Sequence, residues 1–496
     1  MAKFKPSKYQ KAIYKFVKEG AGNAVINAVA GSGKTSTLLA VLGEIPQDAK
    51  VLFLAFNKSI VEELRIKVGN QPNVEISTLH SLGCRALMRQ FRTSIESNKY
   101  SHYVRDGLKY GSLAPTHTLS PERMDEYKGN IHKLLDIARV NLLTAENCLA
   151  ALNDLAYHHD IFLLDNELDI VQRALRWGTS NIGQIDFTDM IYLPNVLDVT
   201  MPQYDWVLID ECQDLNAAQR EMFLKCVKPT GRFIAVGDPK QAIYGFAGAD
   251  VASFNILKSL PNTVELPLSV CYRCDTAMIA LAKTIVPQIE ARKDAPEGTY
   301  NAEAKVSDLE DGDMVLCRNS APLASLCMHL LGEGTKAYIK GKDIGANLIK
   351  MLDTTRKTNL VEAIVVMERE LEKVLEKVCR KEHCGPEEGR QSTAYTAYKD
   401  KIQAIEVLGE GLTQVRQVVS RIESIFSDSD RAGICLSTIH KAKGLEANRV
   451  FILCPDKLYN KRCMRVAWMA EQEANLVYVL YTRAKHYLGV ITDYTA

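Results

Sequence analysis

The sequence predicts an α/β protein with two parallel-sheet cores in tandem, each interrupted by a helical insertion. Continuous apolar runs alternate with amphipathic stretches, which is typical of strands that are buried on both faces of a parallel sheet. This pattern stops at a long polar, helix-favouring stretch and returns after it, and the same sequence of events recurs in the C-terminal half. The length of 496 residues also exceeds what one hydrophobic core usually holds.

The first half begins with an amphipathic stretch at residues 9–18, and a Gly-rich turn later leads into a helix that starts at Lys34. Strands are expected at residues 24–28, 51–55, 206–209 and 232–236. Between the second and third of these strands the chain is rich in Leu, Ala, Asn and Glu, which favours helices. We assign the first core to residues 1–84 and 176–265, and its helical insertion to residues 85–175.

The second half repeats this plan with a shorter insertion. Strands are expected at residues 314–317, 337–340, 434–437, 450–453 and 487–491. Residues 360–378 and 402–422 carry apolar side chains at alternating spacings of four and three, which predicts two amphipathic helices joined by the polar segment 382–392. We expect their apolar stripes to be ordinary core. We assign the second core to residues 266–345 and 431–496, and its insertion to residues 346–430.

Net charge, cysteine content and the lack of long apolar runs bear on the class of protein. With 61 basic and 60 acidic residues the net charge is +1, which neither supports nor excludes nucleic-acid binding. The 13 cysteines form no regular framework; Cys271 with Cys274, and Cys379 with Cys384 around His383, fall short of four metal ligands, so reduced thiols are favoured. No N-terminal apolar segment and no run of ~18 apolar residues occurs, which favours a cytoplasmic protein without a membrane segment.

The most specific motif lies where an apolar strand meets a helix, which is the setting of a phosphate-binding loop. Gly31 and Gly33 allow the backbone to turn its amides toward phosphate oxygens. Lys34 is expected to contact the outer phosphates, and Thr35 to bind Mg²⁺. Ala28 stands where the motif usually has glycine, but it is also small. We predict that ATP is held by Ala28, Val29, Ala30, Gly31, Ser32, Gly33, Lys34, Thr35 and Ser36.

Two adjacent acids end the strand at residues 206–209. Asp210 is expected to hold Mg²⁺ together with Thr35, and Glu211 to act as general base toward the attacking water. Together with the phosphate loop they predict hydrolysis as well as nucleotide binding. After the next strand, Gln241 is placed to sense the γ-phosphate. Tyr244 and Phe246 follow it as candidates to stack on bases, although loop aromatics often serve only packing.

Three motifs in order, D-E-x-Q-D at 210–214, G-D-x-x-Q-x-I-Y-x-F-x-G-A at 237–249 and Y-R at 272–273, resemble the UvrD/Rep/PcrA group of superfamily 1 helicases. The resemblance implies two RecA-like cores and an ATP-driven motor that moves 3′→5′ on single-stranded DNA and separates duplex. It also implies binding to single-stranded DNA and to junctions with duplex. Protein partners stay unknown, and we expect a monomer or weak oligomer.

The resemblance also implies residue roles. Gln10 would read the adenine and Tyr272 would stack on it, Arg273 and Arg483 would reach the γ-phosphate, and Glu446 would meet the nucleotide sugar. Residues 437–446 and 476–484 resemble two further motifs of the group, and residues 186–189 resemble its D-F-x-D segment. The implied DNA contacts are Phe56, Asn57, Thr78, His80, Tyr244, Phe246, Thr438 and His440.

The chain departs from the group in places. Cys271 replaces an asparagine, Phe246 replaces a tryptophan, and residues 346–430 are shorter than the usual second insertion; we expect no further domain after Ala496. An RNA or RNA–DNA-hybrid motor and a component that uses ATP only as a switch remain as alternatives. A small-molecule kinase would leave the later motifs unexplained. The pathway, whether replication, repair, recombination, or a mobile-element or defence role, stays open.

Overall fold

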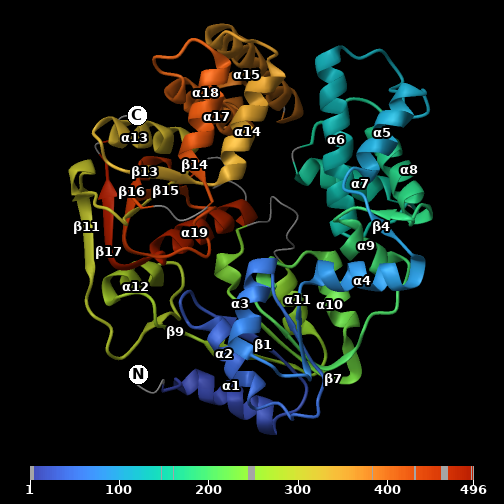
Figure 1. Cartoon of the computed structure of the whole chain (residues 1–496), viewed down its shortest axis with the longest axis vertical. Coiled ribbons are helices and arrows are strands. Elements are labelled where there is room, and N and C mark those ends of the chain that lie inside the picture. The colour runs from blue at the N-terminus through green and yellow to red at the C-terminus, as the bar shows by residue number, and fades with distance from the viewer. Residues whose placement is uncertain are drawn as a thin grey trace. The chain divides into compact units, whose positions relative to one another are not determined.

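A computed structural model describes residues 5–146, 148–159, 161–243, 252–382, 384–428, 432–459, 467–492 and 494. The chain forms two compact units (Figure 1). The first comprises Met1–Ala28 and Gly33–Ser269, and the second comprises Val29–Ser32 and Val270–Ala496. Each unit contains its own parallel sheet, so the predicted fold class is confirmed.

The sheet of the first unit has six strands in the order β3-β2-β6-β7-β1-β8, and all neighbours are parallel. Their bounds are β1 (Asn23–Ala28), β2 (Val51–Leu54), β3 (Val74–Ser77), β6 (Tyr204–Ile209), β7 (Val227–Gly237) and β8 (Thr263–Leu268). The four strands expected from apolar runs are confirmed. The sequence did not predict β3 or β8, which are more exposed than the central strands.

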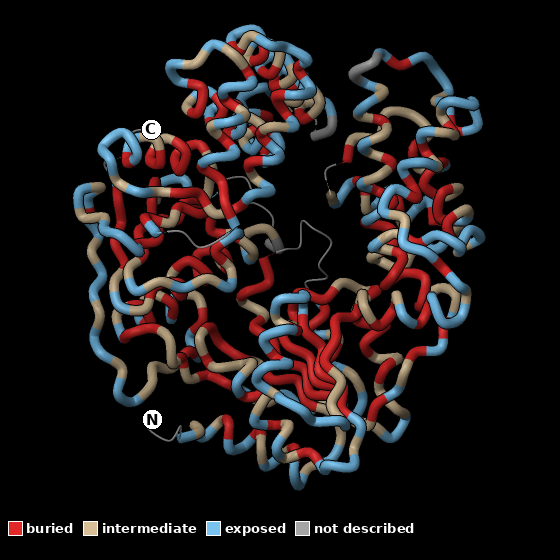
Figure 2. Tube along the Cα trace, in the orientation of Figure 1, coloured by how far each residue is buried: buried red, intermediate tan, exposed pale blue. Residues whose placement is uncertain are grey.

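Helices cover both faces of this sheet, because its central strands are apolar on both sides. Figure 2 shows these strands buried. One face packs against α1 (Lys8–Glu19), α2 (Lys34–Leu42) and α3 (Lys58–Val68). The other packs against α4 (Leu79–Phe91), α9 (Asp189–Val196), α10 (Ala217–Lys225) and α11 (Ser253–Ser259).

A helical insertion lies between β3 and β6. It contains α5 (Lys99–Lys109), α6 (Pro121–Val140), α7 (Leu149–His158), α8 (Glu167–Ser180) and the paired strands β4 (Ser94–Ile95) and β5 (Gln184–Ile185). Its root is a buried ionic cluster around Asp189, whose carboxylate lies 2.7 Å from the Lys99 ammonium and 2.9 Å from the Arg139 guanidinium. The Tyr100 hydroxyl donates to the same carboxylate at 2.9 Å. These bonds tie α5 and α6 to α9.

The second unit has a seven-stranded parallel sheet in the order β11-β17-β16-β12-β15-β13-β14. The strands are β11 (Thr299–Ala304), β12 (Met314–Cys317), β13 (Ala337–Lys340), β14 (Phe426–Ser427), β15 (Ile434–Thr438), β16 (Ala447–Leu453) and β17 (Ala484–Ile491). The five strands expected here are confirmed. Further elements are the pair β9 (Val270–Cys271) and β10 (Glu290–Ala291), α12 (Thr276–Lys283), α13 (Ser320–Gly332) and α19 (Ala467–Tyr481). Short 3-10 helices are η1 (Cys212–Asp214) and η2 (Pro239–Gln241) in the first unit, and η4 (Val306–Asp308) and η5 (Pro455–Lys457) in the second.

The insertion of the second unit is formed by α14 (Lys342–Thr354), α15 (Leu360–Glu382), α16 (Pro386–Gly389), α17 (Thr393–Leu408) and α18 (Val415–Ile425). The prediction of one helix over 402–422 was wrong, because the chain breaks between α17 and α18. Gly411 there has a φ of +73°, which a side-chain-bearing residue rarely adopts.

This second insertion shares one hydrophobic cluster with α13 and the sheet. The Asp400 carboxylate on α17 also accepts hydrogen bonds from the backbone N–H groups of Ser320 and Ala321, at 2.8 and 3.0 Å. It therefore caps the N-terminus of α13. Within the described residues, none of the helices has the length and apolarity that a membrane crossing needs.

Candidate nucleotide and nucleic-acid sites

The predicted site residues of the first unit follow the carboxyl ends of its strands, where α/β sheets bind ligands. The phosphate loop follows β1, and Phe56 and Thr78 follow β2 and β3. Asp210 and Gln241 follow β6 and β7. Since these strands are neighbours in one parallel sheet, residues that are distant in sequence are brought to one edge.

The phosphate loop has the backbone that the motif requires. Gly31 and Gly33 have φ values of +65° and +79°, in the left-handed region that glycine tolerates. Residues Val29–Ser32 of the loop belong to the second compact unit, and there the Ala30 N–H donates to the Tyr478 hydroxyl at 2.8 Å. The Ser32 hydroxyl is buried and has no hydrogen-bond partner in the described part of the chain. A phosphate oxygen is a suitable partner for such a group.

Lys34 and Thr35 meet the two predicted carboxylates. The Lys34 ammonium lies 3.2 Å from a Glu211 oxygen, and the Thr35 hydroxyl donates to Asp210 at 2.5 Å. Burial disfavours the charge on Lys34, but the carboxylates of Glu211, Asp238 and Asp210 outweigh it and raise the pKa of Lys34. Burial, reinforced by the charge on Glu211, raises the pKa of Asp210 to about 6. The site therefore holds excess negative charge around one cation.

Glu211 is held in an unusual conformation. Its φ of +54° and ψ of +42° place a non-glycine residue in the left-handed region, which costs on the order of 1–3 kcal/mol. Its carboxylate accepts a hydrogen bond from the Gln213 side-chain amide at 2.7 Å, and the side-chain oxygen Oε1 of Gln213 accepts from the Asp238 N–H at 3.0 Å. The Gln241 amide donates to the Asp238 carboxylate at 2.7 Å. This network fixes the direction in which Glu211 points.

Sequence reasoning assigned no role to Gln213 and Asp238, although both lie inside motifs that it used. Both are specified polar residues of the motifs D-E-x-Q-D and G-D-x-x-Q, and this could have indicated a role at the site. Burial raises the pKa of Asp238. The donor set of this site fits the predicted ligands: a carboxylate and a hydroxyl suit Mg²⁺, and a buried ammonium suits phosphate oxygens.

Gln10 is buried at the start of α1, where sequence reasoning placed an adenine contact. Its amide oxygen accepts from Ser7 N–H at 2.9 Å in a capping box, and its amide nitrogen donates to the Thr37 hydroxyl at 3.1 Å. Thr37 belongs to α2, directly after the phosphate loop. The structure therefore ties Gln10 to the loop, and its contact with adenine stays a prediction.

The predicted DNA contacts of the first unit occupy exposed or capping positions. Phe56 is 51% exposed, Asn57 caps α3 and Thr78 caps α4. The His80 ring stacks on Phe187 with centroids 4.0 Å apart, and burial lowers the pKa of His80 to about 4. Phe187 is 64% exposed.

Sequence reasoning gave Phe187 no role, although it is the aromatic of the D-F-x-D segment that was recognised. Its exposed ring beside the neutral His80 ring forms a flat apolar surface of the kind that bases stack on. Tyr244 and Phe246 lie outside the described residues, so their predicted roles stay predictions.

In the second unit, Arg273 and Glu446 form an ion pair of 2.6 Å, and Lys485 pairs with the other Glu446 oxygen at 2.7 Å. Arg273 also donates to the Thr482 carbonyl at 3.2 Å. The structure thus brings together Arg273 and Glu446, two residues that were predicted to contact nucleotide. Tyr272 N–H donates to the Gly31 carbonyl at 2.8 Å within the same unit.

Arg483 points into the interior of the second unit. It is 1% exposed and donates to the carbonyls of Val479 and Leu445, each at 2.9 Å. A third bond reaches the Thr482 hydroxyl at 3.2 Å. In this structure Arg483 organises the backbone next to Glu446 and Arg273, and its role at the γ-phosphate stays a prediction.

Thr438 is the last residue of β15 and His440 follows that strand, while the neighbouring strand β12 ends next to Arg318. The Arg318 guanidinium lies 3.4 Å from His440 Nδ1 and 2.9 Å from Glu473. Burial and the Arg318 charge lower the pKa of His440 to about 3, so the ring is neutral at physiological pH. Sequence reasoning did not single out Arg318, since its position beside His440 depends on strand pairing.

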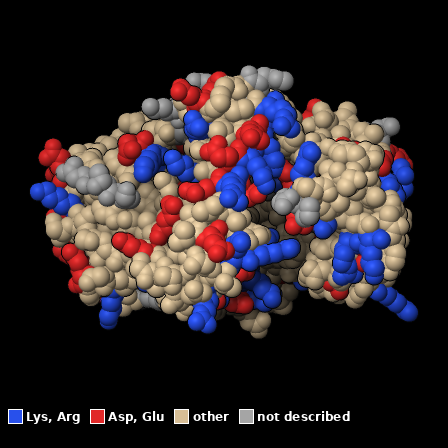
Figure 3. All heavy atoms as spheres, turned by 90° about the horizontal axis from the view of Figure 1, so that it is seen from above, with Lys and Arg blue, Asp and Glu red and all other residues tan. Residues whose placement is uncertain are grey.

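Charge on the surface is mixed. On the face drawn in Figure 3, Lys and Arg gather in groups that alternate with Asp and Glu. This agrees with a net charge of +1. Any phosphate contacts must therefore come from local groups of cations, because the overall charge supplies no steering field.

These features define a P-loop protein with two parallel-sheet cores in one chain. Residues 9–261 match the UvrD/REP helicase N-terminal domain, and residues 335–494 match the UvrD-like helicase C-terminal domain. The chain belongs to the UvrD/REP helicase family.

The chain is similar to F-box DNA helicase 1 of Gallus gallus, at 24% identity over 516 residues that cover 93% of this chain and 46% of that protein. It is also similar to ATP-dependent DNA helicase PcrA of Bacillus subtilis, at 25% identity over 310 residues that cover 58% of this chain and 40% of that protein. F-box DNA helicase protein 1 of Schizosaccharomyces pombe is 24% identical over 277 residues, which are 53% of this chain and 30% of that protein. The matched part is less than half the length of each of these relatives.

Proposed function

We propose that this protein is an ATP-driven motor that moves 3′→5′ along single-stranded DNA and separates duplex at junctions. The observation that carries the proposal is the meeting of Lys34 and Thr35 with Glu211 and Asp210 at the carboxyl edge of the first sheet. A phosphate loop alone would support nucleotide binding, whereas the two carboxylates add the groups that hydrolysis needs. Family membership supports DNA as the track.

Within the first core each residue has one task. Lys34 binds the outer phosphates of ATP, while Thr35 and Asp210 hold Mg²⁺, which supplies charge neutralisation of the phosphates. Glu211 accepts a proton from the attacking water. Gln213 holds the Glu211 carboxylate in place, and Gln241 is the sensor of the γ-phosphate.

The second core supplies positive charge. We assign Arg273 and Arg483 to the negative charge that develops on the transferred phosphoryl group, a contribution worth ~10³–10⁵ in rate in other nucleoside triphosphatases. Glu446, which pairs with Arg273 in this structure, contacts the nucleotide sugar when Arg273 turns to phosphate. Hydrolysis then requires both cores, and cycles of closing and opening produce movement along DNA.

DNA contacts in this proposal come from strand ends in both cores. Phe56 and the His80–Phe187 pair offer rings for bases, and each such stack is worth about 1–3 kcal/mol. Thr78 directly follows β3 in the first core, and Thr438 is the last residue of β15 in the second.

Unwinding of duplexes with either a 3′ or a 5′ single-stranded tail tests the proposal. We expect ATP-dependent unwinding of the 3′-tailed DNA only. Lys34→Ala is expected to abolish both hydrolysis and unwinding, while Lys15→Ala, a change at an exposed lysine on α1, serves as control. Unwinding by Lys34→Ala would contradict the motor, and preference for a 5′ tail would contradict the polarity. If only RNA or an RNA–DNA hybrid stimulated ATP hydrolysis, DNA would not be the track.

A further inference from the structure

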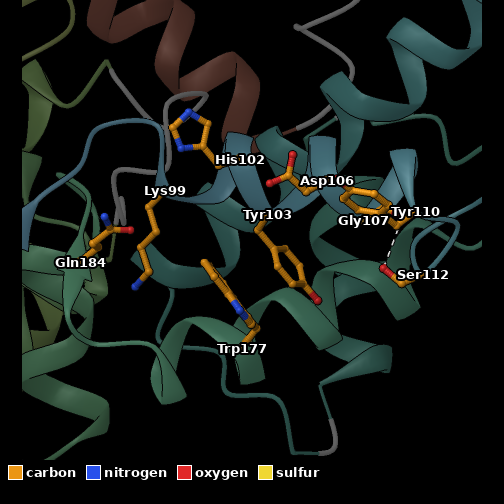
Figure 4. A pocket seen from close by; sticks show the side chains of 9 residues that line it. All are labelled: Lys99, His102, Tyr103, Asp106, Gly107, Tyr110, Ser112, Trp177 and Gln184. Atoms are coloured by element: carbon orange, nitrogen blue, oxygen red, sulfur yellow. Dashed lines mark hydrogen bonds between the residues drawn. The ribbon is translucent and has the colours of Figure 1, made fainter.

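The helical insertion of the first unit contains a hollow of about 350 Å³ that the proposed motor does not use. It lies between α5, α8 and β5, and Figure 4 shows the residues that line it. Its size is at the lower end of the range for small-molecule sites, which suits a ligand of about one nucleotide. Three of its side chains are aromatic: Tyr103, Tyr110 and Trp177.

Two of these rings are held in fixed positions. Tyr103 stacks on Trp177 with centroids 4.4 Å apart and planes 21° apart, and Tyr100 meets Trp177 edge-on at 5.8 Å. Lys99, which lines the hollow, is anchored by Asp189 at 2.7 Å. Figure 4 shows the Tyr103 and Trp177 rings side by side at the centre of the hollow.

Tyr110 differs from these two residues because it is 75% exposed at the end of α5. A large exposed ring beside an ordered aromatic pair gains little from folding, since most of its apolar surface stays in water. Such an arrangement is common where single-stranded nucleic acid binds, because every base presents a flat face to an aromatic ring.

Charge around the hollow selects between two kinds of ligand. An aromatic site can also hold a cationic side chain, usually with help from a carboxylate. Here both neighbouring carboxylates are already paired, Asp106 with Arg105 at 2.9 Å and Asp169 with Arg173 at 3.9 Å. The Lys109 ammonium lies 5.2 Å from the centre of the Tyr110 ring. Asp106 itself lines the hollow, but three cations, Arg105, Lys109 and Arg173, lie around it against the two carboxylates of Asp106 and Asp169, which favours an anionic aromatic ligand.

Arg173 is close enough to matter electrostatically. Burial raises the pKa of Tyr103; the charge on Arg173 opposes that rise, and the charge on Asp169, the partner of Arg173, adds to it. The Gln184 amide lines the same hollow and offers a donor and an acceptor to the edge of a base. Aromatic rings, cations and an amide therefore meet in one place.

We propose that this hollow is a second binding site for single-stranded DNA, which holds one unpaired nucleotide. The base stacks against Tyr110 and the Tyr103–Trp177 pair, Gln184 bonds to the edge of the base, and Lys109 and Arg173 bind phosphate. The proposal rests on DNA being the track of the motor. It adds a contact on the insertion, away from the strand ends of the core.

Binding of fluorescein-labelled oligo(dT) to the full chain at several salt concentrations tests this site. Tyr110→Ala is expected to weaken binding by about five-fold or more, and the slope of log affinity against log salt should not change because the ring carries no charge. Arg173→Ala is expected to weaken binding and to lower that slope by about one. Tyr157→Ala, at a 76% exposed tyrosine on α7 outside the hollow, is the matched control and should bind as the unmodified chain does.

Photo-crosslinking locates the contact. Oligo(dT) that carries 5-iododeoxyuridine should crosslink to Tyr103, Tyr110 or Trp177, and the yield should fall in Tyr110→Ala. Equal affinity and crosslinking in Tyr110→Ala and Tyr157→Ala would refute the site while leaving the motor intact. Displacement of the crosslink by tetramethylammonium at matched ionic strength would show a cation site and also refute it. Failure of the unmodified chain to bind or unwind DNA would overturn both proposals.

Discussion

Replacing Asp210 by asparagine should have opposite effects on stability and on activity, because the buried carboxylate destabilises the fold but is needed for ATP hydrolysis. Asp210 is buried, and its pKa is raised from an ordinary 3.8 to about 6, first by burial and then by the charge on Glu211. At 1.36 kcal/mol per pH unit this gap corresponds to roughly 3 kcal/mol. The folded protein thus binds the proton more tightly than the unfolded chain does, so the free energy of unfolding falls as pH rises from about 4 to about 6. Above that window the whole penalty is present.

Asparagine removes the charge and its titration, but it also weakens the hydrogen bond with Thr35, which is worth about 1.5 kcal/mol with a charged acceptor. We therefore expect Asp210→Asn to raise the free energy of unfolding at pH 7.5 by about 1–2 kcal/mol, and to lose ATP hydrolysis. The assay is guanidinium unfolding without nucleotide or Mg²⁺, at pH values between 4 and 7.5.

Asp205, on the strand β6 that precedes Asp210, gives a control of opposite sign. Hydrogen bonds from Lys228 and from the Lys50 backbone lower its pKa, so Asp205→Asn should reduce stability at neutral pH. The reasoning would be refuted if Asp210→Asn unfolded more easily than the unmodified protein at pH 7.5. The reasoning would also be refuted if the stability of Asp210→Asn changed with pH between 4 and 6 just as that of the unmodified protein does.

Three further predictions concern parts of the fold around the sites. Asp189→Ala leaves Lys99 and Arg139 buried without their shared carboxylate and should cost about 3–5 kcal/mol in guanidinium unfolding; a loss below about 1 kcal/mol would contradict this. Asp400→Ala removes the cap of α13 and should lower stability by about 0.5–2 kcal/mol in the same assay, whereas a change at the exposed Lys399 should have no effect. Phe187→Ala should weaken oligo(dT) binding by about 1–3 kcal/mol in fluorescence anisotropy, and unchanged affinity would mean that the ring only packs on His80.

Much of the fold could be predicted because its strands are continuous apolar segments. Each of the nine strands expected from such runs is present. β8 was missed because its exposed face and Pro267 interrupt the apolar run, and it is an edge strand of the sheet. The helix over 402–422 was predicted without a break because periodicity alone does not register the turn at Gly411.

The site could be predicted only where its residues are close in sequence. The phosphate loop and the Asp210–Glu211 pair are contiguous motifs, and their residues do meet. Arg318 beside His440, and Tyr110 beside Trp177, come from segments far apart in the chain, so only the fold reveals them. The burial of Arg483 likewise follows from how α19 and β17 pack, which no motif records.

In the proposed mechanism, ATP hydrolysis needs residues from both cores. The most direct test measures single-turnover ATP cleavage by Arg273→Ala, together with equilibrium binding of a non-hydrolysable ATP analogue. We predict that the analogue still binds within a few-fold of the unmodified affinity, because Lys34 and Thr35 are intact. Cleavage should slow by about 10³-fold or more, because the charge on the transferred group loses its stabilising partner. Cleavage within about ten-fold of the unmodified rate would contradict a catalytic contribution from the second core.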